Sequence, residues 1–260
     1  MTAKGDKLIA TMLKAEAQLD KDFEKKANAI FELLDPFELD ETYGPFEAAF
    51  LDLLETTSGK FLNLQKGFLK AYVFTEFGIK SVAETKVVST FSPQDLKRYS
   101  GSLSAITTAS IKTHSANGHS INKAYADAKT RAIAAGRRAA RDASREHMGQ
   151  VSMRTKGIKG YKRVATGSET CSFCQMLTTR GAVYAYDTVG FKAHDDCDCI
   201  GVPTVDGPAP SPDQKYVATP KSKPGFDKEK AAAAVKEWER KRDAGELAPS
   251  QLPPISYYNR

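Results

Sequence analysis

Apolar residues recur every three or four positions over most of residues 1–150, which is the spacing of one face of an α-helix. The pattern is clearest over residues 6–34, where the opposite face carries Lys, Glu and Asp. Asp35-Pro36 should end this helix, because proline disfavours the helical conformation of the residue before it. Two more helices are expected over residues 47–54 and 61–79.

A second group of helices follows a short stretch with some β character at residues 85–91. Ser92-Pro93 is a helix start, with serine as the N-cap and proline at the first helical position. We expect this helix to reach about residue 113, and an Asn-Gly turn at residues 117–118 to precede a long helix over residues 120–148.

The pattern changes after residue 156. Alternating residues at 161–166, 182–186 and 199–205 predict short strands. Prolines then mark an extended linker, and charged residues around alanines and Trp238 indicate a last helix. We therefore predict an α+β protein with four parts: a domain of long helices over residues 1–155, a small zinc-stapled α/β module over 156–206, a Pro-rich linker over 207–225, and a C-terminal helix and tail over 226–260.

Charge is distributed unevenly along the chain, whose net charge is +6. An acidic stretch at residues 35–55 is either a solvated face or a docking surface for a basic partner. Residues 119–163 hold twelve Lys or Arg against three Asp or Glu, so this stretch alone carries a net charge of +9. This basic stretch is either a solvated or subunit-facing helix, or a non-specific contact to phosphate backbones. The residues predicted to make this nucleic-acid contact are Arg137, Arg138, Arg141 and Arg145.

All four cysteines and one histidine lie close together, as a Cys-x2-Cys pair and a distal His-x2-Cys-x-Cys group. Thiolate and imidazole are the ligands that Zn²⁺ prefers, and a structural site takes four of them. The sequence therefore predicts a structural zinc ion. Its candidate ligands are Cys171, Cys174, His194, Cys197 and Cys199, with Cys197 favoured over Cys199 for the fourth position.

Catalytic readings of this segment are weaker. A catalytic zinc needs an open coordination position and a base, but no His-Glu-x2-His or deaminase signature is present. A redox Cys-x2-Cys is normally found without a downstream His-x2-Cys-x-Cys. Ser110 and His114 lie one helical turn apart, but a nucleophile–base pair also needs an orienting acid. We therefore do not expect an enzyme.

Four short motifs resemble the phage Mu protein F-like minor head proteins of tailed bacteriophages, in the form found in phages of actinobacteria. They are YKRVATG at 161–167, the knuckle TCSFCQML at 170–177, RGAVY at 180–184, and the closing His-x2-Cys-x-Cys at 194–199.

The resemblance implies a virion component that is made in the host cytoplasm and located inside the head or at the portal. It would act in head morphogenesis and genome packaging or delivery. Its implied partners are the portal protein and the major capsid or scaffold protein, with non-specific contact to packaged DNA and no membrane. The alternatives are a capsid maturation protease and a DNA-binding zinc module unrelated to phages. No apolar run of transmembrane length, and no signal peptide, is expected.

Overall fold

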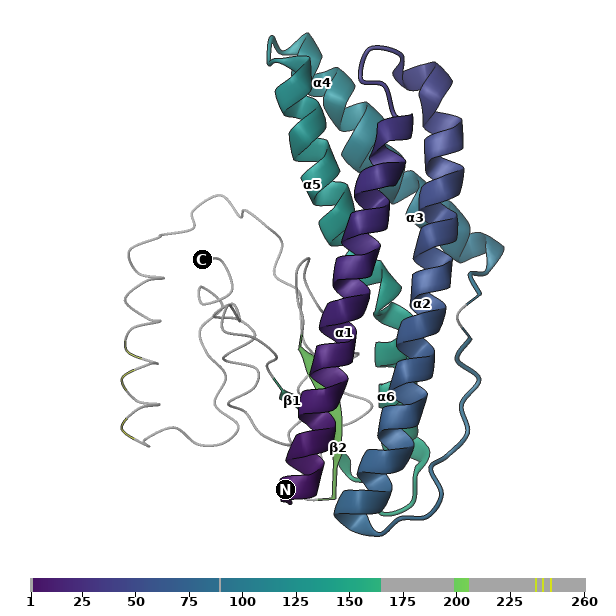
Figure 1. Cartoon of the computed structure of the whole chain (residues 1–260), viewed down its shortest axis with the longest axis vertical. Coiled ribbons are helices and arrows are strands. Elements are labelled where there is room, and N and C mark those ends of the chain that lie inside the picture. The colour runs from purple at the N-terminus through teal and green to yellow at the C-terminus, as the bar shows by residue number, and fades with distance from the viewer. Residues whose placement is uncertain are drawn as a thin grey trace.

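An elongated stem of long helices dominates the protein (Figure 1). This computed structural model describes residues 2–88, 90–164 and 199–205, together with Glu237, Arg240 and Ala244. In chain order, the elements are α1 (Ala3–Ile30), η1 (Phe31–Leu33), α2 (Leu39–Phe77), α3 (Pro93–Ser104), the π-helical η2 (Ala105–Ala109), α4 (Ser110–Ala116), α5 (Ile121–Ala140), α6 (Asp142–Arg154), β1 (Gly160–Val164) and β2 (Ile200–Thr204).

Helix α1 confirms the first prediction. Thr2 is its N-cap, and the Thr2 side chain accepts a hydrogen bond from Gly5 N at 3.2 Å. The helix tightens into η1 and stops just before Asp35-Pro36, as expected. Helices α1 and α2 run side by side along the whole stem (Figure 1).

Helix α2 is one continuous helix where the sequence predicted two. Residues 55–60, which separate the two predicted helices, are polar and include a glycine. The helix continues because Leu54 and Phe61, on either side of this polar stretch, are buried in the stem, and Thr57 and Ser58 are buried with them. Packing of this face outweighs unfavourable helix propensities of less than about 1 kcal/mol per residue. The helix ends at Gly78, whose φ of 67° gives a left-handed C-cap.

The stretch predicted to have β character, residues 85–91, is not a strand at its described positions. Its polar groups bond to helix side chains instead. Ala83 N donates to Thr155 Oγ1 at 3.0 Å, and Phe91 N donates to Glu55 Oε1 at 2.9 Å. Thr85 Oγ1 lies 2.6 Å from His147 Nδ1.

Burial, with a smaller effect of Lys66, lowers the pKa of His147 to about 4, so this histidine is neutral at physiological pH.

The second group of helices begins as predicted. Ser92 and Asp95 form a reciprocal capping box, and proline occupies the first turn of α3. The helical run continues through η2 and α4 to the turn at Gly118, whose φ is 80°. The single helix predicted over residues 120–148 is wrong, because the chain breaks at Arg141 into α5 and α6.

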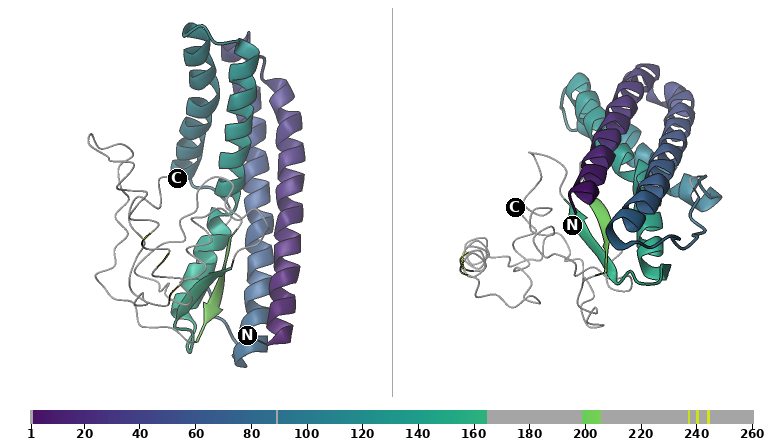
Figure 2. Two further views of the ribbon diagram at one scale, coloured as in Figure 1. Left: turned by 90° about the vertical axis from the view of Figure 1, so that its left-hand side faces the viewer. Right: turned by 60° about the horizontal axis from the view of Figure 1, so that its bottom comes forward.

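The two described strands confirm two of the three predicted ones, and the third, at residues 182–186, lies outside the described residues. β1 and β2 pair antiparallel, with Val164 opposite Ile200 and Gly160 opposite Thr204. The strand pair lies at the lower end of the stem, beside α6 (Figures 1 and 2). It shares a hydrophobic cluster with the helices, formed by residues that include Met12, Leu69, Tyr72, Met148, Val151, Tyr161, Ile200 and Val202.

The other cluster fills the upper stem with aromatic side chains. The ring of Phe50 meets those of Phe23 and Phe31 edge to face, at centroid distances of 5.9 and 6.1 Å. Small residues of α5, including Ala132 and Gly136, let this helix approach the rings closely.

Parts of the predicted organisation lie outside the described residues. They are the cysteine-rich segment up to residue 198, the Pro-rich linker, and the C-terminal region apart from the helical Glu237 and Arg240 and the turn residue Ala244. None of the helices in the described part of the chain is both long and apolar enough to span a bilayer.

Gly136→Ala should destabilise the protein, although alanine is the better helix former. A Cβ at position 136 would lie 2.7 Å from Phe23 Cζ and 3.0 Å from Phe50 Cζ, and both rings are held in the core. We expect the free energy of unfolding to fall by about 1–3 kcal/mol in urea denaturation followed by circular dichroism.

Gly67→Ala is the matched control, because Gly67 is exposed on α2 and a Cβ there meets nothing within 4 Å. Its free energy of unfolding should rise by up to about 1 kcal/mol. Equal gains for both variants would show that α5 does not pack this closely on the aromatic cluster.

Candidate functional site

The strand pair joins the two ends of the segment that holds most of the predicted zinc ligands. Cys171, Cys174, His194 and Cys197 lie outside the described residues. Val164, just before this segment, is paired with Ile200, just after it. The stem therefore holds both ends of the Cys/His segment at one place.

Cys199, the remaining candidate ligand, directly precedes β2 and is 1% exposed. It lines a small pocket of about 10 Å³ together with Glu16, Arg141 and Arg145. This is about the space of one water molecule. Among the described residues, no three metal-ligating side chains lie close enough together to hold an ion.

A buried cluster of charged residues lies beside Cys199. Glu16 and Asp20 of α1 are 4% and 6% exposed, and Arg141, at the junction of α5 and α6, is 4% exposed. The Arg141 guanidinium is hydrogen-bonded to the Asp20 carboxylate, and Arg141 Nη1 lies 3.7 Å from Glu16 Oε2. We call Glu16, Asp20 and Arg141 the charge cluster.

The break between α5 and α6 places Arg141 in this cluster. Its backbone stays close to helical, with φ −89° and ψ −10°, while its N–H bonds to Arg138 O at 3.1 Å. The guanidinium also lies over the Phe61 ring, 5.2 Å from its centroid. α1, α2 and the α5–α6 junction thus meet at one side chain.

The charge cluster was not predicted, although α1 carries a signal for it. Its buried stripe runs through Ile9, Met12, Phe23 and Ala27, with Glu16 and Asp20 interrupting it at helical spacing. Acidic residues on a core-facing stripe require a buried cationic partner. The local sequence of α1 does not say which arginine supplies it.

The four arginines proposed for nucleic-acid contact have different environments. Arg145 is 7% exposed and Arg141 belongs to the charge cluster, so a phosphate backbone does not reach them in this fold. Arg137 is partly buried, and its Nη2 lies 3.7 Å from Asp20 Oδ2. Arg138 is exposed. The basic stretch is therefore not a continuous surface stripe, because its core-facing positions neutralise the acids of α1.

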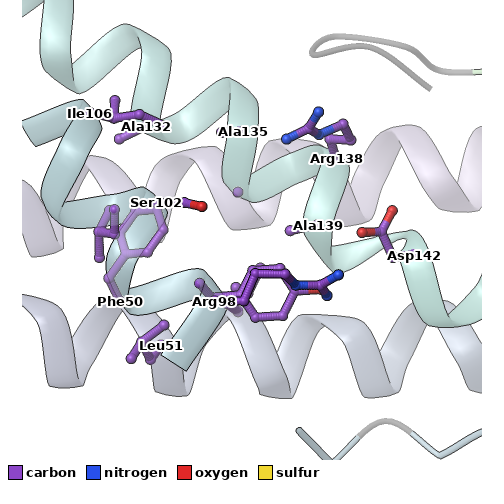
Figure 3. Close-up of a pocket in the computed structure, with 14 residues that line it drawn as sticks. Phe50, Leu51, Arg98, Ser102, Ile106, Ala132, Ala135, Arg138, Ala139 and Asp142 are labelled. Carbon is purple, nitrogen blue, oxygen red and sulfur yellow. The ribbon is translucent and has the colours of Figure 1, made fainter. Parts of the chain in front are cut away.

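An open groove lies on another face of the stem, between α2, α3 and α5 (Figure 3). It has a volume of about 410 Å³. Its floor is apolar, and its polar end carries Arg98, Arg138 and Asp142 (Figure 3). Burial raises the pKa of Asp142, and the neighbouring arginines partly offset this. We call it the α2–α3–α5 groove.

The Ser110–His114 pair does not have the geometry of a nucleophile and its base. His114 Nδ1 lies 2.8 Å from the Ser110 carbonyl oxygen, so this nitrogen donates its proton there. It is 3.4 Å from Ser110 Oγ, which accepts a hydrogen bond from Arg131 Nη2 at 2.5 Å. The His114 ring therefore has no free nitrogen directed at Ser110 Oγ.

The fold defines a class of protein: a long helical stem whose lower end holds a Cys/His-rich segment between two paired strands. A family model described as VG15 protein matches residues 5–220, which include the stem, both strands and every predicted zinc ligand. The chain therefore belongs to the VG15 family, a family of viral proteins. No curated protein and no solved structure shows significant similarity to it.

Replacement of Arg141 by Met should strongly destabilise the protein, because Asp20 and Glu16 would remain buried while losing a cation that pairs with both. Removal of one partner of a buried ion pair costs about 3–5 kcal/mol. We expect a loss of this size in the free energy of unfolding, measured by urea denaturation.

Arg154→Met is the control for the chemical change alone. Arg154 is exposed at the end of α6, where such a substitution should change stability by about 0.5 kcal/mol or less. If both variants lost the same small amount, the charge cluster would not hold the stem together.

Proposed function

We propose that this protein is a minor head protein of a tailed bacteriophage that associates with the portal and acts in head assembly and genome packaging or delivery. One observation carries the proposal: a viral family matches the chain continuously over residues 5–220, and that range contains the motifs that resemble Mu F-like proteins. The capsid or scaffold protein is the other partner that we propose.

The architecture supports a structural role. Helix α2 alone has 39 residues, which correspond to a length of about 58 Å. A stem of this length, filled by continuous hydrophobic clusters, is suited to spanning a distance between partners. The function would then be to connect or position other head components, without chemistry of its own.

The two alternative functions receive less support from the described residues. A maturation protease based on Ser110 would need a base that accepts its proton, whereas His114 Nδ1 is directed at a carbonyl oxygen. A DNA-binding module would need a basic surface, and Arg141 and Arg145 are buried. Arg138, which is exposed, is the member of the set that still fits a phosphate contact.

We further propose that the protein carries one structural zinc ion. Cys171, Cys174, His194 and Cys197 would hold it, which is a complete tetrahedral set of sulfur and nitrogen donors. The paired strands support this proposal, because they bring the ends of the ligand-bearing segment together. Cys199 lines the small pocket beside the charge cluster, which favours Cys197 for the fourth position.

Purified protein should contain about one zinc per chain by inductively coupled plasma mass spectrometry, because a structural site of this kind binds zinc by about 10–16 kcal/mol. Cys174→Ser and Cys197→Ser should lose it. Ser172→Ala, between the two cysteines of the knuckle, and Cys199→Ser should keep it. Full zinc content in Cys174→Ser would contradict the site, and loss in Cys199→Ser alone would reassign the fourth ligand.

The head function predicts that the protein is present in purified procapsids and virions of its phage, detected by quantitative mass spectrometry. Immobilised portal protein should retain it, because a portal-associated head protein binds there before the head closes. A portal protein from an unrelated phage is the control. Absence from both particles would refute the proposed function. Presence without portal binding would leave the capsid or scaffold protein as its partner.

A further inference from the structure

The turn at the top of the stem displays an aromatic side chain to solvent. Phe37 is 73% exposed and Leu33 is 48% exposed, whereas the other phenylalanines near them are buried. Both residues lie between α1 and α2, at the end of the stem opposite the strands (Figure 1). We call residues 32–41 the apical turn.

Hydrogen bonds hold the apical turn in one conformation. Phe37 N donates to Asp35 Oδ1 at 2.8 Å, and Asp35 N donates to Thr42 Oγ1 at 3.1 Å. The Thr42 hydroxyl donates in turn to Glu38 O at 2.7 Å. Phe37 is therefore presented on a preorganised turn, which lowers the entropic cost of docking.

The apical turn is strongly acidic. Residues 32–41 include five carboxylates. Two of them are paired: Asp40 lies 2.5 Å from Lys112, and Glu32 lies 3.7 Å from Lys129. Both carboxylates remain largely exposed, with side-chain exposures of 83% for Asp40 and 78% for Glu32. The full set is Glu32, Asp35, Glu38, Asp40 and Glu41.

The α2–α3–α5 groove has the complementary properties. Phe50, Leu51 and Ala135 contribute to an apolar lining, and its volume of about 410 Å³ accommodates a phenylalanine ring and a neighbouring side chain (Figure 3). Among its lining residues, Arg98 and Arg138 at the polar end outnumber Asp142. Arg98 Nη2 also pairs with Asp95 Oδ1 at 3.2 Å, and the Arg98 side chain remains 60% exposed. Arg98 is exposed and extends over Tyr99, 4.6 Å from the ring centroid.

A chain does not fill its own groove with its own Phe37. The groove begins at Phe50, roughly 17 Å along the axis from the start of α2 at Leu39. The continuous helix between them keeps the apical turn and the groove apart. Phe37 on the acidic apical turn can therefore reach an α2–α3–α5 groove, with its two arginines, only when the groove belongs to another molecule.

We propose that the apical turn of one copy docks into the α2–α3–α5 groove of a second copy, with Phe37 as the anchor and Arg98 and Arg138 facing the carboxylates. The two contacting surfaces differ, so the interface is heterologous, and successive copies form a ring or an open chain. Because one turn and one groove bury little area, the contact is weak and salt-sensitive.

The test uses the full chain in analytical ultracentrifugation up to about 1 mM protein, the Kd that corresponds to about 4 kcal/mol of binding. Wild-type protein should self-associate with rising concentration, and added salt should weaken this association. Phe37→Ala and Ser102→Trp, which fills the groove from an exposed position on α3, should each stay monomeric. Circular dichroism confirms that both variants fold.

Mixing the two variants distinguishes this interface from other modes of association. The Ser102→Trp chain keeps an intact turn and the Phe37→Ala chain keeps an intact groove, so the mixture should form a one-to-one dimer and nothing larger. Phe74→Ala removes another exposed phenylalanine, 57% exposed on α2 but far from the apical turn, and should associate like wild type.

Three results would overturn the proposal: a wild-type chain that stays monomeric, association that Phe37→Ala leaves unchanged, or two variants that do not complement each other. The proposal does not depend on the head function, which is tested on phage particles. Failure of either test therefore leaves the other result interpretable.

Discussion

Pairing of Arg141 with Asp20 and Glu16 is the interaction on which the stem depends. The two carboxylates lie on the core-facing stripe of α1, where their residues are 4% and 6% exposed. A buried carboxylate is tolerated only with a cationic or hydrogen-bonding partner. The break at residue 141 supplies that partner, so the long α1–α2 hairpin and the α5–α6 helices must meet in one register.

A hydrophobic contact alone would not specify this register. Apolar side chains of similar volume can replace one another in a core at modest cost, whereas a guanidinium bonds to carboxylates in a defined geometry. The same junction positions Cys199 and Arg145 beside the charge cluster. The geometry at the base of the Cys/His segment is thus linked to the packing of the stem, through Arg141 and the strand that follows Cys199.

The two ends of the stem carry different kinds of surface. The lower end joins the strand pair to α6 through apolar side chains, which suits a permanent, folded attachment. The upper end displays an exposed aromatic side chain among carboxylates that remain largely exposed, which suits a reversible contact. This polarity along one long axis fits a protein that holds a Cys/His segment at one end and reaches a partner at the other.

The sequence by itself determined the features that depend on near neighbours along the chain. The end of α1 before Asp35-Pro36, the capping box at Ser92, the turn at Gly118 and the strands at both ends of the Cys/His segment all follow from local chemistry. The tertiary structure alone decided whether polar residues are buried. It continued α2 through Thr57 and Ser58, and it split a predicted helix at Arg141. It also placed Arg141, a candidate phosphate contact, in the core as the partner of Asp20 in α1. The reason is that the desolvation of a charge depends on residues distant in sequence.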